Sequence, residues 1–249
     1  MTSPLRRRWD EFRHEARALF TPVAPPCELP LSAVPLAALA YLGIDGLFAQ
    51  LFHASKDNPT QLLYSRLVSA PVLIVVLLSL LKFVRFSPSS CLGMQLQRVP
   101  SAFRYGVWFA ILAVPVMLVL NVFVRVAIPD GKTHPALVLF ENAGPTELTL
   151  IFVNAVVLAP LAEELFFRGI LQNGLMSVLA PGPAVAIAGI IFGFAHLGAW
   201  PDPIPLSFLG ILLGLSLTRT GTLWTPIFFH ASFNGLMLAL AFTQSDTTK

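Results

Sequence analysis

The stretch AVVLAPLAEELFFRGIL, residues 155–171, is a long apolar run that carries three charged side chains. The three are Glu163, Glu164 and Arg168, and every other residue in the stretch is apolar. A helix needs about 20 predominantly apolar residues to cross the hydrocarbon core of a bilayer, which is about 30 Å thick. With its apolar flanks, the stretch therefore predicts a membrane-spanning helix that holds ionisable groups.

The composition of the whole chain also indicates a membrane protein. Of its 249 residues, 55% are hydrophobic and 12% are charged, whereas about 25% are charged in a typical soluble domain. The mean hydropathy is +0.74. These values exclude a water-soluble globule and a disordered chain, and a content of two cysteines excludes a disulfide-stapled mini-protein. The formal charge of +3 does not indicate a nucleic-acid partner, because the basic residues lie between apolar segments.

Outward from residues 155–171, the same length criterion finds seven apolar segments. The fifth and sixth are short and are interrupted by Gly or Pro, so the number of spans is uncertain by one. The segments are continuous apolar runs and lack the alternating pattern of a membrane β-barrel. The expected fold is an all-α, polytopic transmembrane helical bundle of about seven spans, at residues 31–52, 62–81, 105–128, 147–167, 183–198, 204–218 and 223–243.

Residues 1–30 precede the first span and have a different pattern. Apolar residues such as Leu5, Trp9 and Phe12 recur there at three-to-four spacing, with arginines at the positions between them. This pattern predicts an amphipathic helix in the membrane interface, followed by a Pro-rich linker. A signal peptide is the alternative, but no apolar region follows the arginines directly.

The distribution of Lys and Arg predicts the orientation, because positively charged loops tend to stay in the cytoplasm. With the N-terminus inside, eleven of the sixteen basic residues fall on the inner side. The other five, which include Arg66 and Arg125, fall on the outer side or at the outer ends of spans. We therefore expect a cytoplasmic N-terminus, a C-terminus on the opposite side and an outer re-entrant or interfacial loop from Pro129 to Thr146.

Ionisable residues inside the predicted spans are few, and each is by default a candidate for a functional site, because it costs about 2.5–3.5 kcal/mol at a helix centre. Five of the six lie in the second half of the chain, so the first spans are expected to be a scaffold. The six residues are Asp45, Glu163, Glu164, Arg168, His196 and His230.

In the fourth span, Glu164 and Arg168 are four residues apart, which predicts an ion pair on one helix face. Glu163 points about 100° away from Glu164, and Pro160 removes a backbone hydrogen bond ahead of both. A solvated, inert charge cluster at the end of the helix is the alternative interpretation.

Two further spans carry histidines with a neighbour four residues away. The fifth span places Phe192 and His196 on one face, and the seventh places His230 and Asn234 on one face. Taken singly, these residues could be hydrogen-bonded packing residues or interhelical polar contacts. Taken with the carboxylates, they supply a base and hydrogen-bond donors for hydrolysis of an amide by water. No Ser or Cys is paired with them as a nucleophile.

These motifs resemble those of a known family. EELFFR (163–168), FGFAH (192–196) and HASFN (230–234) resemble the EExxxR, FxxxH and HxxxN motifs of the CPBP family of intramembrane proteases. That family includes CAAX prenyl endopeptidases of the Rce1 type and bacterial proteins linked to bacteriocin processing and self-immunity. The resemblance extends over about residues 146–242. It implies a catalytic membrane core at 146–243, after a surface segment at 1–30 and scaffold spans at 31–145.

The resemblance also implies roles for the residues. Glu163 would activate water with His196, and His230 and Asn234 would stabilise the oxyanion. Glu164, Arg168 and Phe192 would organise the site. No cofactor is expected, although Glu163, His196 and His230 could hold zinc as an open three-ligand site.

The expected activity is that of an intramembrane endopeptidase, acting on a membrane-associated peptide that is lipidated and CAAX-like in the Rce1 type. The compact chain is more like the bacterial members, which predicts the bacterial inner membrane. Two other functions are weighed against it. One is a non-catalytic membrane scaffold or immunity protein. The other is a transporter, which usually shows repeated halves that are not visible here.

Overall fold

The computed structural model describes residues 29–54, 58–129, 143–196 and 200–247, and the regular elements in these ranges are all helices. The first half contains α2 (Ala33–Leu51), α3 (Pro59–Phe83), the short α4 (Pro88–Cys91), the 3-10 turn η1 (Leu96–Arg98) and α5 (Val99–Ala127). One long composite helix follows, made of α7 (Pro145–Phe152), η2 (Val153–Leu158), α8 (Ala159–Glu164), η3 (Leu165–Gln172) and α9 (Asn173–Met176). The last helices are α10 (Pro181–Phe194), α11 (Pro203–Thr220) and α12 (Trp224–Thr247).

The expected polytopic helical fold is confirmed. Six helices of the described chain are long and apolar enough to cross a membrane, counting 145–176 as one. The predicted fifth span, 183–198, corresponds to α10, which has only 14 residues and does not reach the length of a span. The predicted interfacial helix at 1–30 and most of the loop 129–146 lie outside the described residues.

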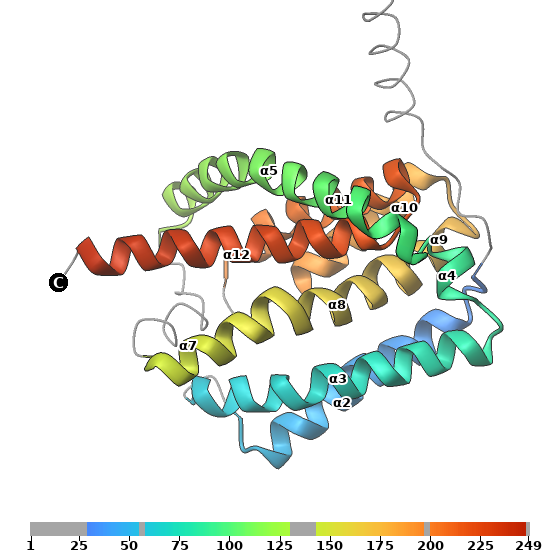
Figure 1. Cartoon of the computed structure of the whole chain (residues 1–249), viewed down its shortest axis with the longest axis horizontal. Coiled ribbons are helices and arrows are strands. Elements are labelled where there is room, and N and C mark those ends of the chain that lie inside the picture. The colour runs from blue at the N-terminus through green and yellow to red at the C-terminus, as the bar shows by residue number, and fades with distance from the viewer. Residues whose placement is uncertain (1–28, 55–57, 130–142, 197–199, 248–249) are drawn as a thin grey trace, which may run out of the picture.

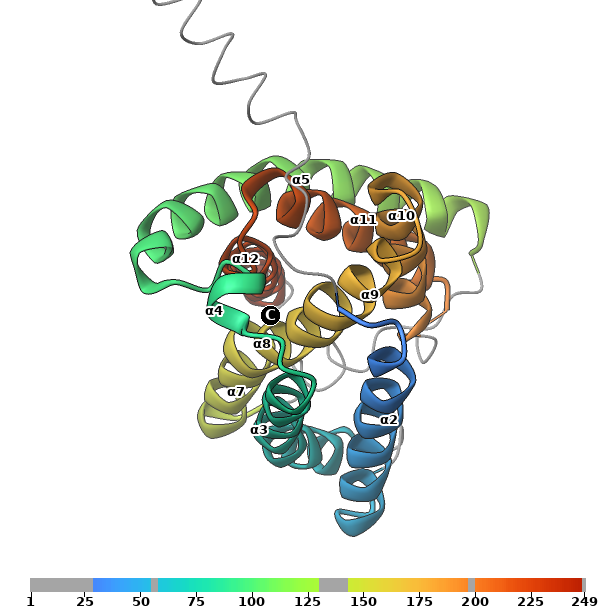
Figure 2. The ribbon, with the colours of Figure 1, turned by 90° about the vertical axis from the view of Figure 1, so that its right-hand side faces the viewer.

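The helices form three neighbouring groups around the composite helix (Figures 1 and 2). The hairpin of α2 and α3 packs on one side of the composite helix, and α12 packs on another side. Helix α5 packs against the far side of α12. Helices α10 and α11 pack closely against each other and cover the third side of the composite helix. The composite helix is therefore enclosed by elements from both halves of the chain.

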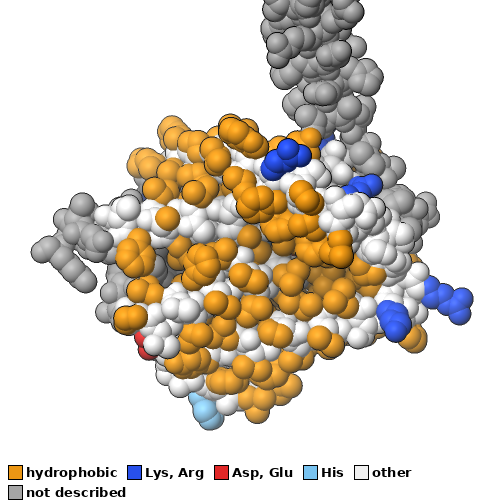
Figure 3. Space-filling view, viewed as in Figure 1, with side chains coloured by type: hydrophobic (Ala, Val, Ile, Leu, Met, Phe, Trp, Pro, Cys, Tyr) orange, Lys and Arg blue, Asp and Glu red, His pale blue; other side chains and the backbone are white. Residues whose placement is uncertain are grey.

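The outward surface of the bundle is apolar, and side chains such as Leu39, Leu42, Trp108 and Val119 are exposed by more than half. Figure 3 shows hydrophobic side chains over most of the visible face. A soluble monomer rarely exposes an apolar patch of more than a few hundred Å². A surface of this kind faces lipid, and the chain is an integral membrane protein.

Close contact between α10 and α11 depends on two glycines that face each other. A Cβ atom built on Gly189 would lie 2.6 Å from the backbone nitrogen of Ile211, and one built on Gly210 would lie 2.6 Å from the carbonyl oxygen of Gly189. Small residues of this kind let two membrane helices approach backbone to backbone. The approach also fixes the Gly210 carbonyl, which has a role in the site below.

The composite helix contains two π-helical stretches, η2 and η3, on either side of α8. In η2 each amide bonds five residues back, and the Ala159 amide donates to the carbonyl of Asn154. Pro160 has no amide hydrogen, so the next bond of this series, to the Ala155 carbonyl, cannot form. The proline therefore leaves one backbone acceptor for another element to satisfy.

Candidate active site

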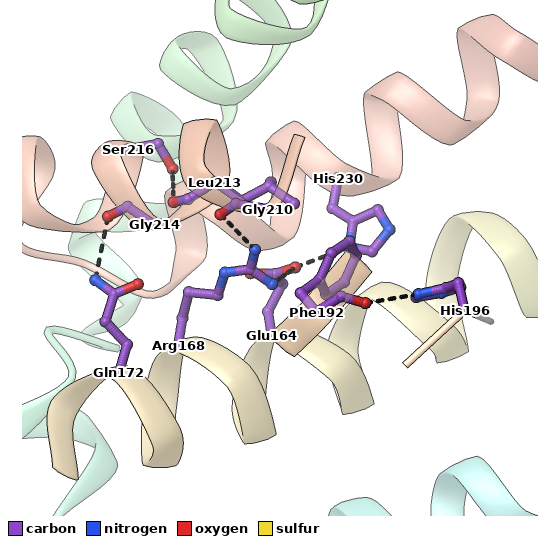
Figure 4. A network of polar contacts seen from close by, with 10 residues as sticks. All are labelled: Glu164, Arg168, Gln172, Phe192, His196, Gly210, Leu213, Gly214, Ser216 and His230. Atoms are coloured by element: carbon purple, nitrogen blue, oxygen red, sulfur yellow. Dashed lines mark hydrogen bonds and ion pairs between the residues drawn. The ribbon is translucent and has the colours of Figure 1, made fainter. Parts of the chain in front are cut away.

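Glu164 and Arg168 form an ion pair in which both side chains are fully buried. Arg168 Nη1 donates to Glu164 Oε1 at 3.0 Å, and the exposed fraction of each side chain is 0%. The pair predicted from the four-residue spacing is thus present (Figure 4). For these two residues the alternative of a solvated charge cluster is wrong, because neither reaches the surface.

Two other helices complete the surroundings of Arg168. Its Nη2 donates to the Gly210 carbonyl oxygen in α11 at 2.7 Å. Its guanidinium carbon lies 4.5 Å from the centre of the Phe192 ring in α10, a cation–π contact. Arg168 therefore ties the composite helix to α10 and α11, and Phe192 covers the buried charge.

His230 of α12 binds the same carboxylate oxygen. Its Nδ1 lies 2.8 Å from Glu164 Oε1, although the two residues are 66 positions apart in sequence. Because Oε1 also accepts from Arg168, Nδ1 is the donor in this bond. This arrangement orients the ring and leaves Nε2 as the ring nitrogen that Glu164 does not engage.

His196 is oriented in a similar way, by a backbone group. Its Nδ1 lies 2.8 Å from the Phe192 carbonyl oxygen. A carbonyl oxygen only accepts, so Nδ1 carries the hydrogen and Nε2 carries the lone pair of the neutral ring. The Phe192 ring packs against both imidazoles, with centroids 5.0 Å from His196 and 5.7 Å from His230. Both histidines therefore contact one buried aromatic ring.

Asn234 of α12 satisfies the backbone acceptor that Pro160 leaves behind. Its Nδ2 donates to the Ala155 carbonyl oxygen at 2.8 Å. The amide group has a second hydrogen on the same nitrogen, which this bond does not use. Asn234 thus forms a polar contact between α12 and η2, and the second hydrogen on its Nδ2 is not used in that contact.

Glu163 is half-buried and differs from its neighbour Glu164 in having no hydrogen bond or ion pair to another described residue. It interacts electrostatically with Tyr41 of α2 and Arg66 of α3, as well as with Arg168. Its carboxylate is therefore on the side of α8 that the first two helices share. Within the ranges that the structure describes, no three His, Cys, Asp or Glu side chains come together as a metal site. The zinc set of Glu163, His196 and His230 is not gathered here.

Polar residues of the site continue along the composite helix to two positions that the sequence reasoning did not select. Gln172 is fully buried and donates through Nε2 to the Gly214 carbonyl oxygen at 3.2 Å. Asn173 donates back to the Arg168 carbonyl oxygen at 2.7 Å. Gln172 lies four residues beyond Arg168, so continuing the Glu164–Arg168 spacing by one turn would have found it.

Residues 145–236 match the family model described as type II CAAX prenyl endopeptidase Rce1-like. This part of the chain is similar to the Rce1-like family. No curated protein and no solved structure matches the chain.

The Rce1-like segment begins with α7 and ends inside α12, so it contains the buried network of Figure 4 together with Glu163 and Asn234. The match supports a CAAX-type membrane protease. Helices α2, α3 and α5 lie outside the matched segment, although α3 packs directly against α8.

Proposed function

We propose that this protein is an intramembrane endopeptidase that hydrolyses a peptide bond with water activated by Glu163. The observation that carries the proposal is the fully buried Arg168–Glu164–His230 network inside an Rce1-like segment. A buried polar network between membrane helices is costly unless every member is paired. The same segment holds the Glu163 carboxylate, which makes no hydrogen bond or ion pair with another described residue, and the two imidazoles of His196 and His230, whose hydrogen bonds use Nδ1. We propose that these groups carry out the hydrolysis.

The chemistry follows from the atoms that are left available. The Glu163 carboxylate takes a proton from a water molecule that His196 Nε2 helps to hold, and the hydroxide attacks the carbonyl carbon. The carbon–nitrogen bond of the tetrahedral intermediate then breaks, and Glu163 returns the proton to the leaving amine. The products are a carboxylic acid and an amine, with no net change in the protein.

The oxyanion of the intermediate needs hydrogen-bond donors. As an imidazolium, His230 donates from Nε2 while its Nδ1 hydrogen remains bonded to Glu164. The second hydrogen of Asn234 Nδ2 is the other donor. In this scheme Glu164 and Arg168 act through His230, which they orient and whose positive charge Glu164 stabilises.

The substrate we propose is a membrane-associated peptide, with a lipidated CAAX-like sequence as the first candidate. Five of the eight described basic residues lie where α3 ends, where α5 begins or where α11 ends, namely Lys82, Arg85, Arg98, Arg104 and Arg219. Figure 3 shows exposed basic side chains toward the end of the bundle that holds α4. We propose that this end is cytoplasmic, in a bacterial inner membrane, with the N-terminus on the same side. The proposed reaction uses no cofactor.

The test is cleavage of a fluorescence-quenched peptide with a prenylated C-terminal CAAX sequence by purified protein in nanodiscs. Glu163→Gln and Glu163→Ala should lower kcat by about 10²- to 10⁴-fold, because the general base is removed. Glu147→Gln is the matched control, since Glu147 lies in the first turn of α7, at the far end of the same composite helix.

The outcomes separate the alternatives. Cleavage that survives in Glu163→Ala would refute this mechanism. Cleavage that is lost with a chelator and returns with zinc would establish the metal-dependent version of the protease. A wild-type protein that cleaves neither the prenylated peptide nor its unmodified counterpart would favour the non-catalytic scaffold or immunity protein.

A further inference from the structure

A second polar cluster lies in the first two helices, outside the Rce1-like segment. Arg66 of α3 forms an ion pair with Asp45 of α2, and Ser69 Oγ donates to the other Asp45 oxygen at 2.9 Å. The sequence predicts Arg66 on the outer side or at the outer end of a span, and Asp45 as one of the ionisable residues inside the spans. In the structure Asp45 lies inside α2 and Arg66 inside α3, and their opposite charges are paired.

The cluster lies against the helix that carries Glu163. Helix α3 packs on α8, and α2 packs on η3. Tyr41, one turn before Asp45 in α2, stacks on Phe166 with ring centroids 4.7 Å apart. Tyr41 and Arg66 lie within electrostatic range of each other and of the Glu163 carboxylate, although no hydrogen bond or ion pair joins either of them to Glu163. The polar side of the α2–α3 hairpin therefore faces the carboxylate that the proposed reaction uses.

Glu163 needs such a neighbour, because an uncompensated carboxylate inside a membrane is expensive and a base must be ionised. Arg168 is the other cation that interacts with Glu163, but its two terminal nitrogens are occupied by Glu164 and Gly210. Arg66 has a single ion-pair partner in the described chain, and 46% of its side chain is exposed. Its remaining donors can therefore turn toward Glu163.

We infer that Arg66 is a positioning residue for Glu163, held in place by Asp45 and Ser69, so that the first two helices complete the active site. Arg66 balances and orients the Glu163 carboxylate as the general base. This inference rests on the proposed function. It gives the α2–α3 hairpin a part in the reaction that the expectation of a scaffold did not include.

The experiment compares kcat and KM for the prenylated peptide across variants of the cluster, with thermal unfolding measured on each. Arg66→Gln should lower kcat by about 10- to 100-fold with KM little changed, since a misplaced group costs rate more than binding. Arg66→Lys keeps the positive charge and should recover most of the rate. Arg125→Gln is the matched control, because Arg125 also sits in an ion pair inside a helix, with Asp202 at 2.8 Å, and should leave kcat unchanged.

Two further variants separate positioning from simple stabilisation. Exchanging the charges, Asp45→Arg with Arg66→Asp, restores an ion pair but puts the negative charge next to Glu163, so unfolding should recover while kcat stays low. In a Glu163→Gln background, Arg66→Gln should have no further effect on the residual rate, because both act at one step. If Arg66→Gln does not fold, Asp45→Asn loosens the same arginine while keeping its charge, and should also lower kcat.

Three results would overturn this inference while the proposed function stands. The first is an unchanged kcat in Arg66→Gln, or in Asp45→Asn if that variant replaces it. The second is a kcat restored by the exchanged charges, and the third is an equal loss of rate on Arg66→Gln in the wild-type and Glu163→Gln backgrounds. A wild-type protein that cleaves no peptide overturns both.

Discussion

Replacing Arg168 by methionine should lower the free energy of unfolding by about 3–5 kcal/mol, because the change leaves the Glu164 carboxylate buried without its counter-ion. The structure supports a value of this size. Both side chains are fully buried, and the charged atoms are 3.0 Å apart. At an effective dielectric constant of about 20, charges at that distance attract by about 5–6 kcal/mol. Methionine also loses the bond to the Gly210 carbonyl.

The assay is unfolding by a denaturing detergent added to the protein in mild micelles, followed by tryptophan fluorescence. The cycle needs Glu164→Gln, Arg168→Met and the double variant. The double variant should be less destabilised than the sum of the single ones, because neither charge is then left alone, and the coupling should be about 0.5–3 kcal/mol. A loss below about 1 kcal/mol in Arg168→Met, or strictly additive losses, would refute the reasoning.

Three further predictions concern the packing around the site. Gly189→Ala should destabilise the protein and lower cleavage, because the new Cβ meets the α11 backbone, whereas Gly182→Ala in the same helix meets nothing within 4 Å and should change the unfolding free energy by under about 0.5 kcal/mol. Asn234→Ala should cost about 1–3 kcal/mol in the same unfolding assay, and less in a Pro160→Ala background that restores the backbone donor; equal costs in both backgrounds would contradict the assignment. Phe192→Ala should cost about 3–5 kcal/mol, since the ring is 1% exposed, and a loss under 1 kcal/mol would show that the ring does not pack as described.

The sequence was sufficient for features that depend on spacing along one helix. Continuous apolar runs predicted the helices, and positions four apart predicted the Glu164–Arg168 pair. The Phe192–His196 contact follows from the same spacing. Such features need no knowledge of which helices are neighbours, because the helical repeat of 3.6 residues fixes them.

Features that depend on packing between helices could not be predicted in this way. No pattern along the chain indicates that His230 bonds Glu164 across 66 positions, or that Arg66 meets Asp45 across 21. The π-helical stretches also escaped prediction, since their apolar sequences look like those of ordinary helices. The orientation of Glu163 toward α2 and α3 depends on how this hairpin packs against α8, and the sequence alone does not give that packing.

The shortness of α10 makes the hydrophobic thickness of the protein uneven. Fourteen helical residues extend about 21 Å, less than the about 30 Å of a bilayer core. One face of α10 is open to lipid through Ile187, Ile190 and Phe194, and His196 follows directly after its end. Thinning of the bilayer beside a short apolar segment is one way in which lipid adjusts to it. Thinning at this place would bring headgroups and water closer to the imidazole, on the side from which a membrane-attached peptide would approach.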